Sequence, residues 1–313
     1  MLLVNLLFLV VPTIDALSKS SIASNSKTNP RSPPHSSDRV LSPEYYKSVY
    51  KSIGETKQDQ GPNFSTNGAD DLDTIPQIGG RTPWDIGNSR PQPAIVRAYK
   101  EGKIRGNVLD AGCGVGENCM FLADKYGIKS VAGFDLSEDA VQFAANTVKT
   151  IIDEREDEPP FWTAPRFLAA SCAVVADLHG EELLSGIASD DKIEKGNEKP
   201  LFDVVIDSGL LHCLSNEDAG QYVNQISKLL QPNTGRFYIG CFSTANPDPW
   251  DNPRRISEDY LRNELFSNRE KWEVVSCRDC WWARPPTRGS TTGGAFSLAL
   301  WVEVRCLMSK NDD

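Results

Sequence analysis

The residues best suited to chemistry are three alternating glycines that follow a short apolar run. Val108-Leu109-Asp110 ends in an aspartate, and Gly112, Gly114 and Gly116 come directly after it. A helix-like segment then begins at Glu117. This order is typical of a strand, a tight turn and a helix N-terminus, the layout of a nucleotide-type ligand site at the carboxyl end of a parallel strand. Glycines in such a turn let a ligand lie against the backbone.

The spacing and the charge of this turn favour S-adenosylmethionine (SAM) as the ligand. A dinucleotide fingerprint needs a further glycine at position 117, where this chain has Glu117. A phosphate-binding loop needs Gly-Lys-Ser/Thr after its glycines, and that sequence is missing here. Asp110 would repel a pyrophosphate, whereas it suits the positively charged amino group of SAM.

A second acidic residue follows at the distance that this interpretation requires. Ser130–Asp135 is a short apolar strand that ends in a carboxylate, roughly 20 residues past the glycine turn, where it can accept hydrogen bonds from both ribose hydroxyls. NAD-binding proteins also use a carboxylate to bind the ribose. The distinction between SAM and NAD therefore rests mainly on Asp110 and the glycine turn. The alternative is a buried glycine turn without a ligand, together with a capping aspartate.

Strand-like and helix-like segments alternate from the glycine turn onward, which predicts an α/β domain. The expected strands cover residues 107–111, 131–135, 166–170, 202–207, 236–241, 273–278 and 296–305. The expected helices cover residues 117–126, 137–152, 216–230 and 257–265. His179, which Gly180 follows, is expected in a loop.

The motifs occur in an order that resembles the class I SAM-dependent methyltransferases, and most closely the small-molecule enzymes related to the thiopurine, thiol/halide and bacterial heterocycle methyltransferases. They are Pro83-Trp84-Asp85, Pro91-Gln92-Pro93, the glycine turn, Gly133–Ser137 and Phe202–His212. The likeness runs from about Thr82 to Leu307. It implies a Rossmann-like fold with a seven-stranded, mostly parallel sheet, helices on both faces and a C-terminal antiparallel hairpin.

The resemblance also implies the contacts of the cofactor. The expected cofactor-binding residues are Trp84, Asp110, Gly112, Gly114, Asp135, Leu136, Ser171, Cys172 and Asp207. Trp84 would close over the sulfonium as a lid, and Leu136 would cover the adenine. The chain departs from the family pattern after the third strand, where Ser171-Cys172 replaces the usual Asp-Ala. Either Ser171 accepts the hydrogen bond of the adenine amino group, or an insertion brings Asp177 to it.

Methyl transfer is an in-line displacement that needs alignment of the acceptor and exclusion of water, whereas a general base is optional. The candidates for catalysis are Asp207, at the end of the fourth strand, and His212, five residues later. A histidine there can act as a base or orient an acceptor at neutral pH. Packing of His212 under a helix is an equal alternative. Arg254-Arg255 could hold an acceptor carboxylate, although surface charge beside a helix is the commoner explanation.

Composition narrows the class of partner. The chain has 313 residues, 39% of them hydrophobic, which suits one catalytic domain after a leader. Its net charge of −10 repels nucleic acid and anionic membranes, so we expect a small-molecule methyl acceptor, no nucleic acid, and no membrane for the mature domain. The favoured function is SAM-dependent methylation of an N, S or O atom. The alternatives are a thiol/halide methyltransferase, an NAD(P)-linked oxidoreductase and a catalytically silent SAM-binding protein.

The N-terminus predicts a targeting leader ahead of a methyltransferase domain at 81–309. Residues 1–16 are mostly apolar and resemble a signal peptide too short to span a bilayer. Residues 17–80 are rich in Ser and Pro, begin with a basic stretch that resembles a transit peptide, and are expected to be largely disordered. This combination favours the secretory route into the plastid of an alga-like cell, with secretion or the ER lumen as the alternative.

The eight cysteines lie along predicted core strands and turns, so we expect them to be reduced. Cys277-Arg278-Asp279-Cys280 is a lone C-x-x-C without a second pair, which predicts no zinc site.

Overall fold

The computed structural model describes residues 42–56, 91–154, 162–185, 187, 201–248, 253–283 and 296–307. The signal-peptide-like segment 1–16, most of the leader 17–80 and the lid candidate Trp84 lie outside the described residues, so these interpretations stay predictions.

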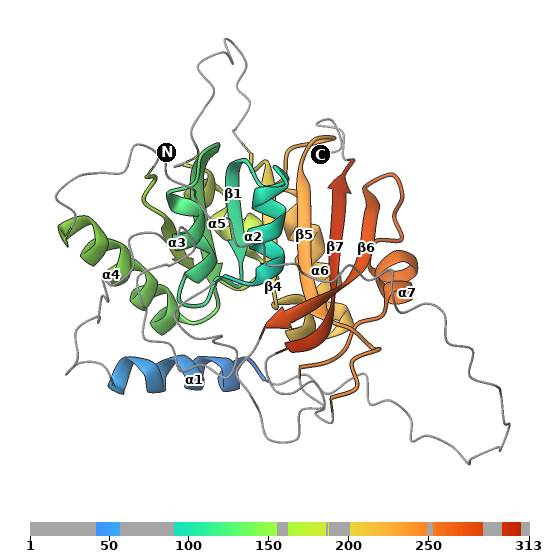
Figure 1. Cartoon of the computed structure of the whole chain (residues 1–313), viewed down its shortest axis with the longest axis horizontal. Coiled ribbons are helices and arrows are strands. Elements are labelled where there is room, and N and C mark those ends of the chain that lie inside the picture. The colour runs from blue at the N-terminus through green and yellow to red at the C-terminus, as the bar shows by residue number, and fades with distance from the viewer. Residues whose placement is uncertain are drawn as a thin grey trace, which may run out of the picture. The chain divides into compact units, whose positions relative to one another are not determined.

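A seven-stranded sheet forms the centre of the fold, in the order β3-β2-β1-β4-β5-β7-β6 (Figure 1). The strands are β1 (Gly106–Ala111), β2 (Ile128–Asp135), β3 (Arg166–Ala169), β4 (Val204–Ser208), β5 (Arg236–Phe242), β6 (Trp272–Ala283) and β7 (Phe296–Cys306). The first five pair in parallel, and β7 runs antiparallel to both β5 and β6. This topology confirms the predicted fold class.

Helices cover both faces of the sheet. The helices are α1 (Pro43–Thr56), α2 (Pro93–Lys100), α3 (Glu117–Ala123), α4 (Glu138–Glu154), α5 (Val175–Leu184), α6 (Asn216–Ser227) and α7 (Glu258–Tyr260), with the short helices η2 (Leu211–Cys213) and η3 (Leu261–Leu265). Side chains alternate between the two faces of a strand. Val108 therefore packs in a core with α2, α3 and α4, whereas Leu109 packs in a core with α5 and α6.

Three helices were not predicted, namely α1, α2 and α5. α1 lies within the segment expected to be largely disordered, yet it packs against α4 and buries Tyr50. The prediction that His179 lies in a loop is wrong, because α5 contains His179 and its side chain faces Glu182 at 3.7 Å. Gly180 does not end the helix. It lies at a buried position where even an added β-carbon would only touch Leu229 at 3.9 Å.

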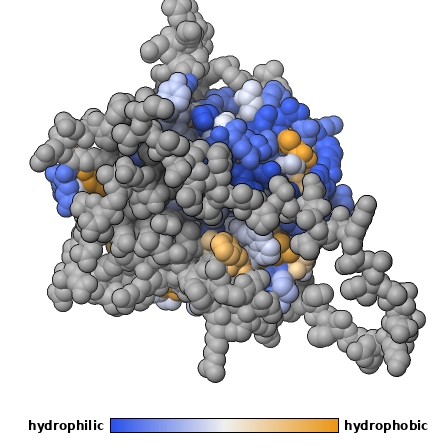
Figure 2. All heavy atoms as spheres, in the orientation of Figure 1, coloured by the Kyte–Doolittle hydropathy of each residue, from blue (hydrophilic) through white to orange (hydrophobic). Residues whose placement is uncertain are grey.

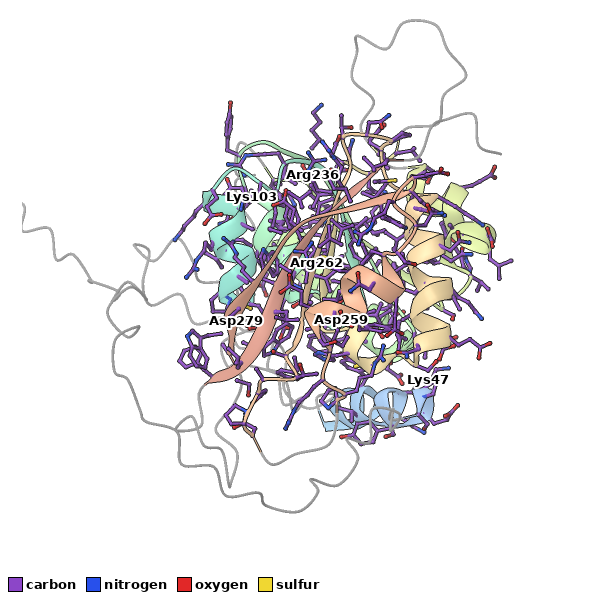
Figure 3. The ribbon with its side chains drawn as sticks, turned by 90° about the vertical axis from the view of Figure 1, so that its right-hand side faces the viewer. Lys47, Lys103, Arg236, Asp259, Arg262 and Asp279 are labelled. Atoms are coloured by element: carbon purple, nitrogen blue, oxygen red, sulfur yellow. The ribbon has the colours of Figure 1, made fainter. Side chains whose placement is uncertain are left out.

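The two ends of the sheet differ in character. At the amino ends of the strands, Lys103 and Arg236 form ion pairs with Glu303 at 3.9 and 3.5 Å, and Lys103 also pairs with Glu101 at 3.0 Å. Figure 3 shows Lys103 and Arg236 at the end of the molecule opposite Lys47 of α1. The amino end of the sheet is therefore closed by ion pairs, and α1 lies toward the carboxyl ends.

No disulfide joins the eight cysteines, all of which lie among the described residues. Among the described residues, no helix combines the length and the apolar character that a membrane span requires.

Candidate active site

The glycine turn between β1 and α3 is shaped so that only glycine fits. Gly112, Gly114 and Gly116 have φ angles of 69, 53 and 85°, in the left-handed region that side chains disfavour. A β-carbon at position 112 would come within 2.9 Å of the Leu210 β-carbon, and one at position 116 would come within 2.8 Å of the Phe167 ring. The turn therefore packs closely against neighbouring side chains at the carboxyl end of the first strand, and Gly112 is its partly exposed residue.

Three carboxylates lie at the ends of three adjacent strands around this turn. Asp110 is on β1, Asp135 on β2 and Asp207 on β4, and the register pairs Ala111 with both Phe134 and Asp207. Asp110 and Asp207 are fully buried, and Asp135 is partly exposed. Within the described part of the chain, none of the three forms an ion pair with a lysine, arginine or histidine. The site thus concentrates acidic groups that no cation of the described residues balances.

The environment raises the pKa of each of these carboxyls. Burial, with a smaller contribution from the charges of Asp207 and Asp135, raises the pKa of Asp110 to about 7, against weak hydrogen bonds from Asn118 and Cys119. Burial likewise raises the pKa of Asp207 to about 7 and that of Asp135 above its usual value. A bound cation would lower these pKa values, because it stabilises the ionised carboxylates.

Asp135 connects the glycine turn to the start of α4. Its carboxylate accepts hydrogen bonds from the backbone N–H groups of Gly114 and Ser137, each at 2.9 Å. Leu136 is half-buried and follows it directly. The structure thus brings the predicted ribose residue and the predicted adenine residue to the glycine turn, and their contacts with a cofactor stay predictions.

The two alternatives for the adenine contact differ in their surroundings. Asp177 lies on α5, where its carboxylate accepts hydrogen bonds from Lys228 at 2.6 Å and Gln225 at 2.8 Å on α6. Ser171 and Cys172 instead lie two and three residues after the end of β3, next to the strand that ends in Asp135. The geometry therefore favours Ser171 over Asp177, whose carboxylate joins two helices.

The Asp207 carboxylate is saturated with hydrogen bonds. It accepts from the backbone N–H groups of Gly209, Leu210 and Leu211 at 3.1, 2.7 and 3.0 Å, and from the Tyr222 hydroxyl at 3.0 Å. These bonds hold the turn that leads into η2. The side chain therefore fixes the backbone in front of His212, and a catalytic role for Asp207 stays a prediction.

His212 is a buried, neutral imidazole. Its Nδ1 accepts a hydrogen bond from the backbone N–H of Phe242 at 3.3 Å, and its ring stacks on Phe242 with the centroids 4.6 Å apart. Trp282 meets it edge-on at 5.8 Å. Burial, with a smaller contribution from the charge of Arg254, lowers the pKa of His212 to about 3. Its proton is therefore on Nε2, so the ring can donate a hydrogen bond but is a weak base.

Two contacts near the site were missed in the sequence. The Tyr50 hydroxyl of α1 lies only 2.6 Å from where a β-carbon on Gly114 would be, so an N-terminal helix contacts the glycine turn. Gln92 forms a pair of hydrogen bonds with the backbone of Ala283, at 2.9 and 3.0 Å, which ties the start of α2 to the end of β6. The Ser42-Pro43 helix start was the available signal for α1.

Comparisons with known proteins agree with this geometry. A family model described as "Methyltransferase domain" matches residues 87–286. The chain is 28% identical over 198 residues to the 2-heptyl-1-hydroxyquinolin-4(1H)-one methyltransferase of Mycobacteroides abscessus, which covers 63% of this chain and 71% of that protein. It is also 28% identical over 167 residues to an uncharacterized methyltransferase of Schizosaccharomyces pombe, covering 52% of this chain and 92% of the other.

Solved structures share the fold. One is described as "Conversion of a Disulfide Bond into a Thioacetal Group during Echinomycin Biosynthesis"; it has a TM-score of 0.56 and 26% identity and covers 85% of this chain and 93% of its own. A SAM-dependent methyltransferase from Anabaena variabilis has a TM-score of 0.53 and 12% identity and covers 86% and 96% of the two chains, a likeness in fold alone.

Proposed function

Because this chain belongs to the methyltransferase domain family, it is a SAM-dependent methyltransferase, and we propose that it methylates an N, S or O atom of a small aromatic or heterocyclic molecule. The acceptor class rests on two observations. The relative from Mycobacteroides abscessus carries a hydroxyquinolinone in its name. The net charge of −10 disfavours nucleic acid as a substrate.

One observation carries the assignment of the cofactor: a glycine turn bordered by carboxylates that no described cation balances. SAM presents an ammonium and a sulfonium, two positive charges that such carboxylates attract. When bound, SAM supplies an electrophilic methyl group and a neutral thioether leaving group. Gly112 is the partly exposed glycine of the turn, and Asp135, which accepts a hydrogen bond from the Gly114 N–H, is placed where a ribose can reach a carboxylate.

The residues near the carboxyl ends of β4 and β5 would align the acceptor and exclude water from the site. Phe242 and Trp282 are buried around His212, and together they exclude water from the side of the site where β4 ends. His212 can orient an acceptor through Nε2–H. Because its pKa lies near 3, it does not take up a proton at neutral pH.

Two measurements test this function. Titration calorimetry should show saturable binding of SAM and none of NADH, and Asp135→Ala should weaken SAM binding by about 1–3 kcal/mol through the loss of partners for two hydroxyls. Release of S-adenosylhomocysteine (SAH) is then measured over heterocyclic thiols, phenols, amines, iodide and 1-hydroxyquinolin-4(1H)-one. Binding of NADH in place of SAM would overturn the cofactor, and SAM binding without SAH release from any acceptor would indicate a silent binding protein.

We further propose that the leader directs the chain through the secretory route to a plastid. The proposal rests on the apolar residues 1–16 and on the basic, Ser/Pro-rich residues that follow. Residues 1–80 fused to a fluorescent protein should label plastids in an algal cell. Label confined to the ER or the medium would contradict the plastid part of this proposal.

A further inference from the structure

An arginine is buried beyond the carboxyl end of β5 without an anionic partner in the described residues. Arg254 is only 6% exposed. One of its terminal nitrogens, Nη1, donates a hydrogen bond to the Asn216 side chain at the start of α6, and the guanidinium lies 5.3 Å from the centre of the Tyr260 ring. The other two nitrogens, Nε and Nη2, are buried and have no hydrogen-bond partner among the described residues. One of the three guanidinium nitrogens is therefore satisfied and the other two are not.

This arrangement is unusual because an arginine cannot give up its charge inside a protein. A buried guanidinium without a counterion is costly, and most buried charges are paired. Arg262, by comparison, has the partners that an arginine usually has in a protein. It is partly exposed, it donates hydrogen bonds to Glu258 at 2.7 Å and to the Val274 carbonyl at 3.2 Å, and Figure 3 shows it beside the β6–β7 hairpin. Arg254, by contrast, keeps two strong donors ready for a group that the described chain does not supply.

The position of Arg254 is next to the acceptor side of the site. The loop after β5 folds back, so that the Ile256 N–H donates a hydrogen bond to the Phe242 carbonyl at 2.8 Å, and Phe242 stacks on His212. The charge of Arg254 is near enough to His212 to disfavour protonation of that ring. In the same loop, the buried side-chain nitrogen of Asn246 also lacks a partner. Two residues of the loop that borders His212, Arg254 and Asn246, thus carry buried donor nitrogens without a hydrogen-bond partner among the described residues.

We propose that Arg254 binds an anionic group of the methyl acceptor, so that the substrate class is an aromatic anion, carrying either an ionised oxygen or sulfur or a carboxylate. This inference rests on the proposed function, because it places the acceptor beside His212. In this arrangement the carboxylates bind the cationic cofactor, and Arg254 binds the anionic acceptor.

An anionic acceptor also fits the absence of a basic imidazole at His212. When the lone pair of an ionised oxygen or sulfur forms the bond to the methyl carbon, the acceptor becomes neutral and no proton has to be removed. The chain then needs a cation to hold the acceptor in its ionised form, which is the role assigned to Arg254. A neutral His212 is free to orient the same group through Nε2–H.

Binding of simple aromatic probes tests the anion site without any turnover. The full chain, loaded with SAH, is titrated with benzoate and with benzamide, its neutral analogue. Wild-type protein should bind benzoate at least about tenfold more tightly than benzamide, because charge-assisted hydrogen bonds are the strong ones. Arg254→Gln should abolish that preference, and Arg254→Lys should retain part of it. Arg262→Gln removes an equal charge from a partnered arginine and should leave the preference unchanged.

Each variant must first bind SAM with wild-type affinity, which shows that the fold and the cofactor side are intact. Equal binding of benzoate and benzamide, or an undiminished preference in Arg254→Gln, would overturn the anion site while leaving SAM-dependent transfer standing. A preference that Arg254→Gln and Arg262→Gln reduce equally would also overturn it, because the effect would then be general electrostatics.

Turnover distinguishes the two sources of the anion. If Arg254 holds the acceptor atom itself, Arg254→Gln should raise the KM for 1-hydroxyquinolin-4(1H)-one by about tenfold or more. If it holds a separate carboxylate, the KM should rise for 2-mercaptobenzoate and stay unchanged for the hydroxyquinolinone. Loss of benzoate binding in a protein that methylates neither compound would support the anion site and contradict the proposed acceptor class.

Discussion

At the scale of single residues, the site combines groups that are individually unfavourable in the ligand-free protein. Asp110 is a buried carboxyl with a pKa near 7 and only long hydrogen bonds from Asn118 and Cys119, and Arg254 is a buried cation with unsatisfied nitrogens. Such groups cost stability until a ligand of opposite charge arrives. The buried His212 stays neutral. The pattern indicates a site built to bind a cation and an anion side by side.

The first prediction concerns the pH dependence of SAM affinity. The pKa of Asp110 is about 7 in the free protein, and a bound ammonium or sulfonium would lower it. Binding near pH 7 should therefore release protons, and SAM affinity should rise between pH 6 and pH 8. Calorimetry in two buffers with different ionisation enthalpies measures the protons released. Asp110→Asn should reduce this release, and proton uptake on binding would contradict the assignment.

The second prediction separates orientation from base catalysis at His212. Since the pKa of His212 is about 3, kcat at saturating SAM should show no inflection near pH 6.5 that His212→Gln removes. The variant should instead lower kcat uniformly from pH 5 to pH 8, because glutamine keeps a donor but loses the stacking on Phe242. SAM affinity should hold. An inflection near 6.5 that disappears in the variant would show that His212 is a base after all.

At the scale of elements, the sequence predicted those parts that local patterns specify. Short apolar runs that end in an aspartate predicted β1, β2 and β4. The sequence therefore placed Asp110, Asp135 and Asp207 at the carboxyl ends of these strands, where the structure has them. The burial of Arg254 could not be read from Arg254-Arg255, because the folding of the loop alone decides which of two adjacent arginines points inward.

The helices that were missed have weak local signals. α5 contains Gly180, and a glycine inside a segment argues against a helix there. α1 carries many polar residues, and its place depends on Tyr50, whose contact with Gly114 joins positions far apart in the sequence. Such contacts follow from the tertiary structure, which local pattern does not encode.

The third prediction follows from the position of α1. Because Tyr50 covers the glycine turn, removal of residues 1–56 should weaken SAM binding by about tenfold through loss of the cover that excludes water, equivalent to about 1.4 kcal/mol. Removal of residues 1–41 alone is the matched control and should leave the affinity unchanged. Tyr50→Ala should reproduce most of the loss. Tighter SAM binding after removal of α1 would show instead that Tyr50 competes with the cofactor for the turn.

At the scale of the whole molecule, the buried carboxyls lie at the carboxyl ends of the strands, whereas partly exposed ion pairs lie at the amino ends. Lys103, Arg236 and Glu303 pair at the amino edge. The described part of the face in Figure 2 is mainly hydrophilic, with small apolar patches. Stability against pH should therefore be governed by the buried carboxyls at the carboxyl edge and not by the surface pairs, whose contribution is small.

The fourth prediction is that Asp110→Asn stabilises the ligand-free protein increasingly as the pH rises. A carboxyl whose pKa is raised on folding, here from 3.8 to about 7, favours the folded state at low pH, and this contribution is lost as the pH rises from about 4 to 7. Above pH 7 the ionised, buried Asp110 should cost about 4 kcal/mol at most. Asparagine can still accept the hydrogen bond of Asn118 and carries no charge.

Thermal unfolding of the two proteins without ligand measures this effect. The Tm of Asp110→Asn should exceed that of the wild type by several degrees at pH 8 and by little near pH 4.5, where both side chains are neutral in the folded state. His212, whose pKa is lowered from 6.5 to about 3, destabilises both proteins equally as the pH falls through that range, so it cancels in the difference. Asp177→Asn is the control, because the pKa of that exposed carboxylate is lowered by Lys228 and its removal should not stabilise the protein at pH 8.

Saturating SAH should then narrow the difference at pH 8, since the amino group of the ligand would compensate the charge of Asp110 in the wild type alone. A Tm difference that is independent of pH, or one that SAH leaves unchanged, would mean that Asp110 is not the carboxylate that meets the cation.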